Sequence, residues 1–343
     1  MSRPNASWLV GGVSAAGAIT YLSVVPRQYV HVDHHGATET LRRMRAGQGF
    51  YDALRDTYWF DSGIRLGGPR SFRTPFLFEV LALFPAQWLL PLFVLVVVVG
   101  TCVLLADASA HPYAALPVAL FLLVAGRWFG AGRMETWMFV ELWAVPPLAL
   151  SYWGWSKRRP WVGGPAAAAA TLVRELALPV VCFGLVLARV RGRNWRPWAV
   201  ALIVAVLGLT LHLVLALQAG SPNGTEAPLL GSGDPPRTVV DVMSCGLPLG
   251  YGLVLWSLAI IHLVRRRLVT PVTPLIALPL LGLFVDRGYW GNLIAPFIVL
   301  WVGELVGDVW AERHPKPPPE PRATAVVGAE LSPAGRAPAR SGR

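Results

Sequence analysis

WVGGPAAAAATLVRELALPVVCFGLVLA, the stretch from Trp161 to Ala188, decides how many times this chain crosses a membrane. A membrane-spanning helix needs about 20 apolar residues, so the stretch is too long for one ordinary span. The charged pair Arg174-Glu175 interrupts it near the middle, and we therefore predict two short membrane helices that meet at this pair. Because broken helices are tolerated at membrane depth only where the exposed backbone lines a polar cavity, the break predicts an internal site.

The rest of the chain is apolar enough to contain further membrane-spanning helices. Of its 343 residues 54% are hydrophobic and only 14% are charged, which excludes a soluble globular class. The first apolar run is followed by Pro26 and Arg27 rather than by a cleavage site, so we expect it to be retained as a helix. Other spans are expected near residues 8–25, 87–106, 113–130, 135–153, 197–218, 239–263, 270–285 and 290–310. We predict an all-α polytopic membrane protein, with about ten transmembrane or membrane-embedded helices in a domain formed by residues 1–310.

Basic residues orient these helices. If residues 161–188 cross twice, the basic clusters fall on one side of the membrane, which the positive-inside rule makes cytoplasmic. They are Lys157-Arg158-Arg159, the arginines at 189, 191, 193 and 196, Arg265 to Arg267, and the tail. The net charge of +11 then reflects topology and anionic lipid head groups, and it requires no nucleic acid partner. We expect a multi-pass plasma-membrane protein with both termini cytoplasmic and a disordered cytoplasmic tail at residues 311–343.

The loop at residues 26–75 lies outside the membrane in this topology and is rich in polar and charged side chains. Within it, Leu41 and Met44 alternate with arginines in helical spacing, which predicts an amphipathic helix over Ala37–Ala46 on the outer membrane surface. Gly47 and Gly49 are expected to end that helix. Most acidic residues of the chain also fall on the outer side, so we expect the chemistry to face outward.

The arrangement resembles membrane glycosyltransferases of the GT-C superfamily, most of all the compact bacterial members that use polyprenyl-phosphate sugars. The likeness rests on a first span followed at once by the outward Asp33, on AGQGFYDALR at residues 46–55, and on FRTPF at residues 72–76. It implies a hexosyltransferase that moves a sugar such as mannose from a polyprenyl-phosphate donor to a glycan or glycolipid acceptor. Many members of the superfamily carry paired acids after the first helix, whereas this chain has Asp33-His34-His35.

Transfer from a lipid phosphate needs a base that deprotonates the acceptor hydroxyl. Asp33 is our candidate, because it stands just past a rigid helix; the alternative is that it only caps the helix that follows. His34 could orient this carboxylate or simply be solvated. No organic cofactor is expected, and a divalent metal held by Asp33, His34 and a distant acid remains an alternative, although the chain lacks local ligand spacing.

The departing phosphate needs cations, and guanidinium groups match phosphate oxygens bidentately. Arg174 is the first candidate, because an arginine inside an apolar run must have a partner. It could instead pair with a buried acid to fix helix packing, or extend to the outer surface. Other candidates for substrate binding are Arg70, Arg73, Glu135, Glu175 and Arg287, of which Arg287 could alternatively join an aromatic belt.

Two other classes would also place charged residues inside the membrane. A lipid-linked sugar flippase or another transporter would do so, but such proteins commonly show inverted repeats and lack a long loop after the first helix. The third interpretation of the chain is a non-catalytic membrane subunit of an envelope-assembly machine. The long first loop favours the enzyme.

Overall fold

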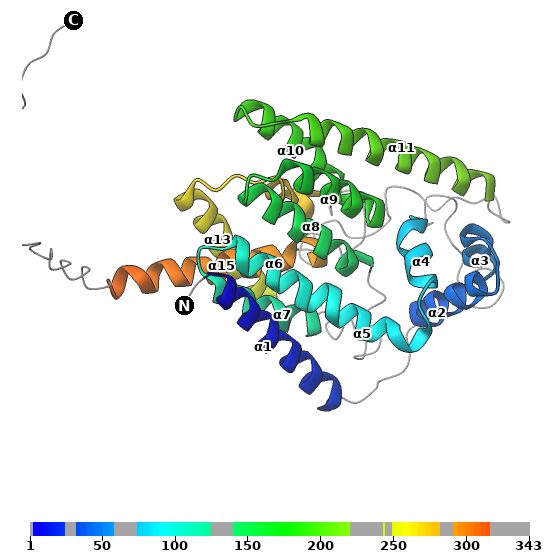
Figure 1. Cartoon of the computed structure of the whole chain (residues 1–343), viewed down its shortest axis with the longest axis horizontal. Coiled ribbons are helices and arrows are strands. Elements are labelled where there is room, and N and C mark those ends of the chain that lie inside the picture. The colour runs from blue at the N-terminus through cyan, green and yellow to red at the C-terminus, as the bar shows by residue number, and fades with distance from the viewer. Residues whose placement is uncertain are drawn as a thin grey trace, which may run out of the picture.

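The structure, a computed structural model, describes residues 3–24, 32–57, 74–124, 140–219, 243, 249–281 and 291–315, and these contain helices and turns but no strand (Figure 1). The predicted all-α class is therefore confirmed for this part of the chain. Within it, three helical segments are long and apolar enough to cross a membrane: Ala86–Ala108, Arg196–Ala219 and Gly291–Arg313. Every other predicted span also contains helix, but the total of ten crossings stays a prediction.

The helical segments follow the predicted order. The first is α1 (Arg3–Val24), and Ala86–Ala108 is built from η3 (Ala86–Trp88), α5 (Leu89–Phe93), the π-helical η4 (Val94–Gly100) and α6 (Thr101–Ala108). The rest of the bundle comprises η5 (Pro112–Ala115), α7 (Leu116–Val124), α8 (Val140–Ser156), α9 (Pro160–Val173), η8 (Glu175–Ala177), α10 (Leu178–Val190), α11 (Arg196–Ala219), α13 (Leu249–Arg266), η9 (Thr273–Ala277), α14 (Leu278–Leu281) and α15 (Gly291–Arg313). The helix α15 therefore continues three residues past the predicted start of the tail.

The predicted break at Arg174 is confirmed. Here α9 ends, Arg174 adopts an extended backbone with φ −146° and ψ 112°, and η8 and α10 follow. Pro179 explains why the first helix cannot continue through this point, because proline has no N–H and its ring clashes with the carbonyl four residues earlier, that of Glu175. Each of the two helices is consequently too short for an ordinary span.

Small residues allow α9 and α10, the two helices on either side of the break, to pack closely against their neighbours. A Cβ added to Gly154 of α8 would lie 2.6 Å from the backbone nitrogen of Gly163 in α9, so these helices approach almost backbone to backbone. Gly184 of α10 leaves room for the fully buried ring of Trp198 in α11. The position of Arg174 is thus fixed by close packing on both sides of the break.

The predicted surface helix is α2 (Val32–Arg45), which starts earlier than expected and ends at Gly47, where φ is +92°. Leu41 is fully buried while Arg42 is exposed, as the amphipathic pattern predicts. It packs against α3 (Phe50–Asp56) and α4 (Pro75–Ala82), and the three helices gather at one end of the bundle (Figure 1). The hydroxyl of Tyr51 lies 2.8 Å from Nδ1 of His212, which joins α3 to α11.

Three basic turns end their helices in the same way. The chain reverses after α8, α10 and α13 through residues with positive φ, namely Arg158, Gly192 and Arg267. In each turn an amide bonds the carbonyl five residues earlier, as in Arg159 to Gly154, Arg193 to Ala188 and Leu268 to Leu263, which is the Schellman geometry. Side chains from the last turn of α8 and from the turns after α10 and α13 line one pocket, so these three helix ends lie close together.

Candidate functional site

Arg174 is buried at the helix break, with only 2% of its surface exposed. Its Nε lies 2.8 Å from Oε1 of Glu141, which is buried in the first turn of α8, and its Nη1 donates a hydrogen bond of 2.6 Å to Oε1 of Glu175. The Nε–H does not point along a hydrogen bond to Glu141, so the contact is an ion pair, and neither atom has a hydrogen-bond partner within the described residues. The break therefore buries a guanidinium between one buried and one half-exposed carboxylate.

The end of the first loop reaches the same break. Thr74, the residue before α4, donates a buried hydrogen bond of 2.9 Å from its hydroxyl to the backbone carbonyl of Val173, the last residue of α9. Helix ends leave their last carbonyls without partners inside the helix, so this side chain satisfies one that the break exposes. Arg73 precedes Thr74 in the sequence, although Arg73 itself lies outside the described residues.

The structure thus brings together two of the predicted site residues, Arg174 and Glu175, and adds Glu141. The reading in which Arg174 extends to the surface is wrong, because the side chain is buried. Asp33 and His34 lie in the first turn of α2, but their side chains fall outside the described part. The remaining candidates, Arg70, Arg73, Glu135 and Arg287, lie outside the described residues, as does Asp286.

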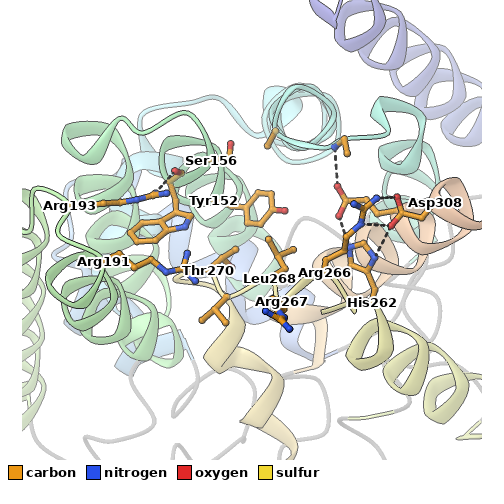
Figure 2. A pocket seen from close by; sticks show the side chains of 15 residues that line it. Tyr152, Ser156, Arg191, Arg193, His262, Arg266, Arg267, Leu268, Thr270 and Asp308 are labelled. Atoms are coloured by element: carbon orange, nitrogen blue, oxygen red, sulfur yellow. Dashed lines mark hydrogen bonds and ion pairs between the residues drawn. The ribbon is translucent and has the colours of Figure 1, made fainter. Parts of the chain in front are cut away.

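A second ionic cluster lies at the basic end and was not predicted. On α15, Asp308 accepts hydrogen bonds from Nε and Nη2 of Arg266 of α13, and its Oδ1 lies 2.9 Å from Nε2 of His111. Glu304, one turn earlier, accepts a 2.6 Å hydrogen bond from the hydroxyl of Ser109, and its Oε2 lies 3.1 Å from Nε2 of His262. The cluster ties α13 and the turn after α6 to α15 (Figure 2).

Helical spacing would have revealed this cluster. Glu304 and Asp308 are four residues apart on α15, and His262 and Arg266 are four residues apart on α13, so each pair shares one helix face. Ionisable residues in apolar helices are costly unless they are paired, which makes two such pairs a strong signal. The predicted site residues lie toward the outer ends of the spans, and these four residues are not among them.

No three histidine, cysteine, aspartate or glutamate side chains within the described residues form a group that could hold a metal ion. At the basic end Asp308 is occupied by Arg266, and at the break the two carboxylates face a guanidinium. In both places the described carboxylates face cationic or hydrogen-bonding side chains.

The break and the basic cluster lie at opposite ends of α8. Glu141 stands in the first turn of this helix and Ser156 at its last residue, fifteen residues later in the sequence, which corresponds to about 22 Å. Comparisons of the chain with models of protein families, with curated proteins and with solved structures returned no match.

Proposed function

We propose that this chain is a membrane glycosyltransferase that moves a hexose such as mannose from a polyprenyl-phosphate donor to a lipid- or envelope-linked acceptor on the outer face of the membrane. The observation that carries the proposal is the buried Arg174 at a helix break. A helix break inside an apolar bundle exposes backbone polar groups, and the guanidinium there would exchange its half-exposed partner, Glu175, for the phosphate of the donor lipid.

Two further contacts support the proposal. The hydrogen bond between Thr74 and Val173 holds the end of the first loop against the break, so residues of the loop and of the break can act on one substrate. The helix α2 packs against α3 and α4, and α4 packs against α9, so the described helices of the first loop are held beside the helix that ends at the break.

The reaction assigns a role to each site residue. The acceptor hydroxyl loses its proton to Asp33 and its oxygen bonds to the anomeric carbon of the sugar, while the bond from that carbon to the phosphate oxygen breaks. The polyprenyl phosphate leaves with the bonding electrons. Arg174 stabilises its added negative charge together with the arginines at 70, 73 and 287. His34, Glu135 and Glu175 position the substrates.

The first experiment tests the activity itself. The purified protein, in detergent or in vesicles, is incubated with a panel of polyprenyl-phosphate sugars and glycolipid acceptors, and transfer of the sugar is followed by mass spectrometry. We expect transfer from at least one polyprenyl-phosphate hexose. Donor binding without transfer by the intact protein would favour a lipid-linked sugar transporter.

The second experiment separates phosphate binding from packing at Arg174. Arg174→Lys keeps a charge but not the two-armed geometry, so we expect transfer to fall roughly tenfold or more. Arg174→Met leaves Glu141 buried without its cation and should also lower stability.

The matched control is the double variant Arg174→Met/Glu141→Leu. Replacing both partners of a buried ion pair by apolar residues often restores stability, so we expect this variant to fold well and to remain inactive. Recovery of transfer along with stability would show that Arg174 serves only packing and would contradict its proposed role in binding the lipid phosphate.

A further inference from the structure

A pocket of about 380 Å³ opens at the basic end of the bundle (Figure 2). It lies between the last turn of α8, the turn that joins α10 to α11, the end of α13 and the second half of α15. Its size is in the range of small-ligand sites. Four arginines line it: Arg191, Arg193, Arg266 and Arg267.

The carboxylates of this pocket are already engaged. Nε and Nη2 of Arg266 donate hydrogen bonds to Asp308, and Glu304 accepts hydrogen bonds from the Ser109 hydroxyl and the Ala110 amide. His262 lies within 3.1 Å of Glu304 as well. The lining of the pocket holds four arginines but only these two acids, so positive charge is in excess.

Arg191 and Arg193 both lie near the ring of Trp155. The guanidinium carbon of Arg193 lies 4.2 Å from the centre of the Trp155 ring, and that of Arg191 lies 5.9 Å from it. Arg193 also donates a hydrogen bond of 3.1 Å to the carbonyl of Trp155. Burial first, and then the charges of Arg158 and Arg191, lower the pKa of Arg193 from its ordinary value.

Within the described residues, neither Arg191, Arg193 nor Arg267 forms an ion pair with a carboxylate. Repulsion between clustered guanidinium groups is relieved when an anion binds among them, and phosphate oxygens match their forked geometry. The contact with the Trp155 ring and the hydrogen bond to the Trp155 carbonyl hold Arg193 in place before any ligand arrives. The pocket is thus preorganised for a phosphate group.

The surroundings of the pocket indicate where the phosphate comes from. On α13, just before Arg266, the apolar side chains of Ile261 and Val264 are 52% and 71% exposed. Inside the pocket, Leu268 and Val269 add apolar surface beside the arginines. A ligand with an acyl chain would cover the exposed face of α13 while its phosphate entered the pocket, whereas a free phosphate would leave that face uncovered.

We propose that this pocket binds the phosphate group of an anionic membrane lipid, with Arg191, Arg193 and Arg267 as its main donors. The inference does not depend on glycosyl transfer, since the pocket lies at the opposite end of α8 from Arg174. It assigns to the basic clusters a specific lipid site in addition to their part in setting topology.

The test measures thermal unfolding of the whole protein in a neutral detergent. Phosphatidylglycerol, phosphatidylcholine or inorganic phosphate is titrated in, and the rise in Tm gives an apparent affinity. Arg191→Gln/Arg193→Gln removes two donors from the pocket. Arg189→Gln/Arg265→Gln removes the same charge from two positions that do not line it.

We expect phosphatidylglycerol to raise the Tm of the unchanged protein and of the Arg189/Arg265 variant alike. In the Arg191/Arg193 variant its apparent affinity should fall roughly tenfold or more, as expected for the loss of charge-assisted hydrogen bonds. Because Arg193 also contacts Trp155, that variant could fold poorly, so Arg267→Gly serves as a second one. Arg267 has a φ of +48°, which glycine adopts without strain, and we expect this variant to fold normally and to bind the lipid more weakly.

Equal affinities in all variants would mean diffuse attraction to a basic surface and would overturn the proposal. A rise in Tm that inorganic phosphate matches would overturn the assignment to a lipid. An equal effect of phosphatidylcholine would overturn the need for an anion.

Discussion

The two ends of α8 bury charge in different ways. At one end a single guanidinium, that of Arg174, lies at a helix break beside Glu141, and the facing Nε and Oε1 atoms have no hydrogen-bond partner within the described residues. At the other end Glu304 and Asp308 each have several hydrogen-bond partners, from the turn after α6 and from α13. Hydrogen-bonded networks that join several segments rigidify a fold, whereas a buried ion pair at a helix break is typical of places where a substrate binds. We therefore expect changes at the break end to affect activity most and changes at the basic cluster to affect stability most.

The largest effect is expected at Asp33, which the proposed reaction uses as its base. Asp33→Asn keeps the shape of the side chain but removes the proton acceptor, so turnover should fall by roughly 10²- to 10⁴-fold with little change in Tm. Steady-state transfer rates and thermal unfolding of the same preparation provide the measurement. Near-normal transfer would move attention to Glu135 or Asp286.

The ionic cluster around Glu304 and Asp308 should respond in the opposite way, with a loss of stability rather than of activity. Asp308→Ala leaves Arg266 and His111 without their shared acceptor; because half of the Arg266 side chain is exposed to solvent, we expect a loss of about 2 to 3 kcal/mol in unfolding free energy. The matched control is Glu312→Ala on the same helix, which breaks only the exposed pair with Arg265 and should cost at most about 1 kcal/mol. Equal losses in the two variants would contradict the difference between buried network and surface pair.

A smaller effect tests the packing around this cluster. A Cβ on Gly307 would lie 2.6 Å from Cγ of His111, so Gly307→Ala must displace the ring from Asp308 and should cost about 1 to 3 kcal/mol. Gly12→Ala is the control, because nothing lies within 4 Å of its added Cβ and alanine favours helix. A neutral Gly307→Ala would show that the contact of His111 with Asp308 contributes little.

The smallest effect concerns α2 at the outer end. The hydrogen bond from Arg42 lowers the pKa of Glu39 from 4.5 to about 2, partial burial opposes the shift, and Arg43 adds to it. A carboxylate with a depressed pKa stabilises the folded state above its unfolded pKa and loses that contribution as the pH falls from about 4.5 to 2. Since Arg42 is largely exposed, we expect Glu39→Gln to cost less than about 1 kcal/mol at pH 6 and less still at pH 3. A cost that is the same at both pH values would contradict the ion-pair explanation.

The local features of the fold followed from the sequence. The charged pair in an apolar run predicted the break at Arg174, and the spacing of Leu41 and Met44 predicted α2. Both signals lie within one segment, where helical period and span length are enough to decide. The number of crossings is a different matter, because it depends on residues that the structure does not describe.

The partner of Arg174 could not be read from the sequence. Glu141 lies on α8, where nearly every side chain is buried, so no apolar face shows which residues point toward α9. Cys182 illustrates the same difficulty, because it lies in an apolar run as Cys102 does, yet Cys182 is exposed on α10 while Cys102 is buried. The rotation of each helix about its own axis is set by packing between segments, which single-segment patterns do not contain.

The central claim is that the break and the basic turns face opposite sides of the membrane. The most direct measurement places single cysteines at Glu175, beside the break, and at Asn194, in the turn after α10, both of which are exposed. The native cysteines at 102, 182 and 245 are replaced by alanine, and intact cells are labelled with a membrane-impermeant thiol reagent before and after permeabilisation. We predict labelling at Glu175→Cys in intact cells and at Asn194→Cys only after permeabilisation. Labelling of both positions from the same side would contradict the account.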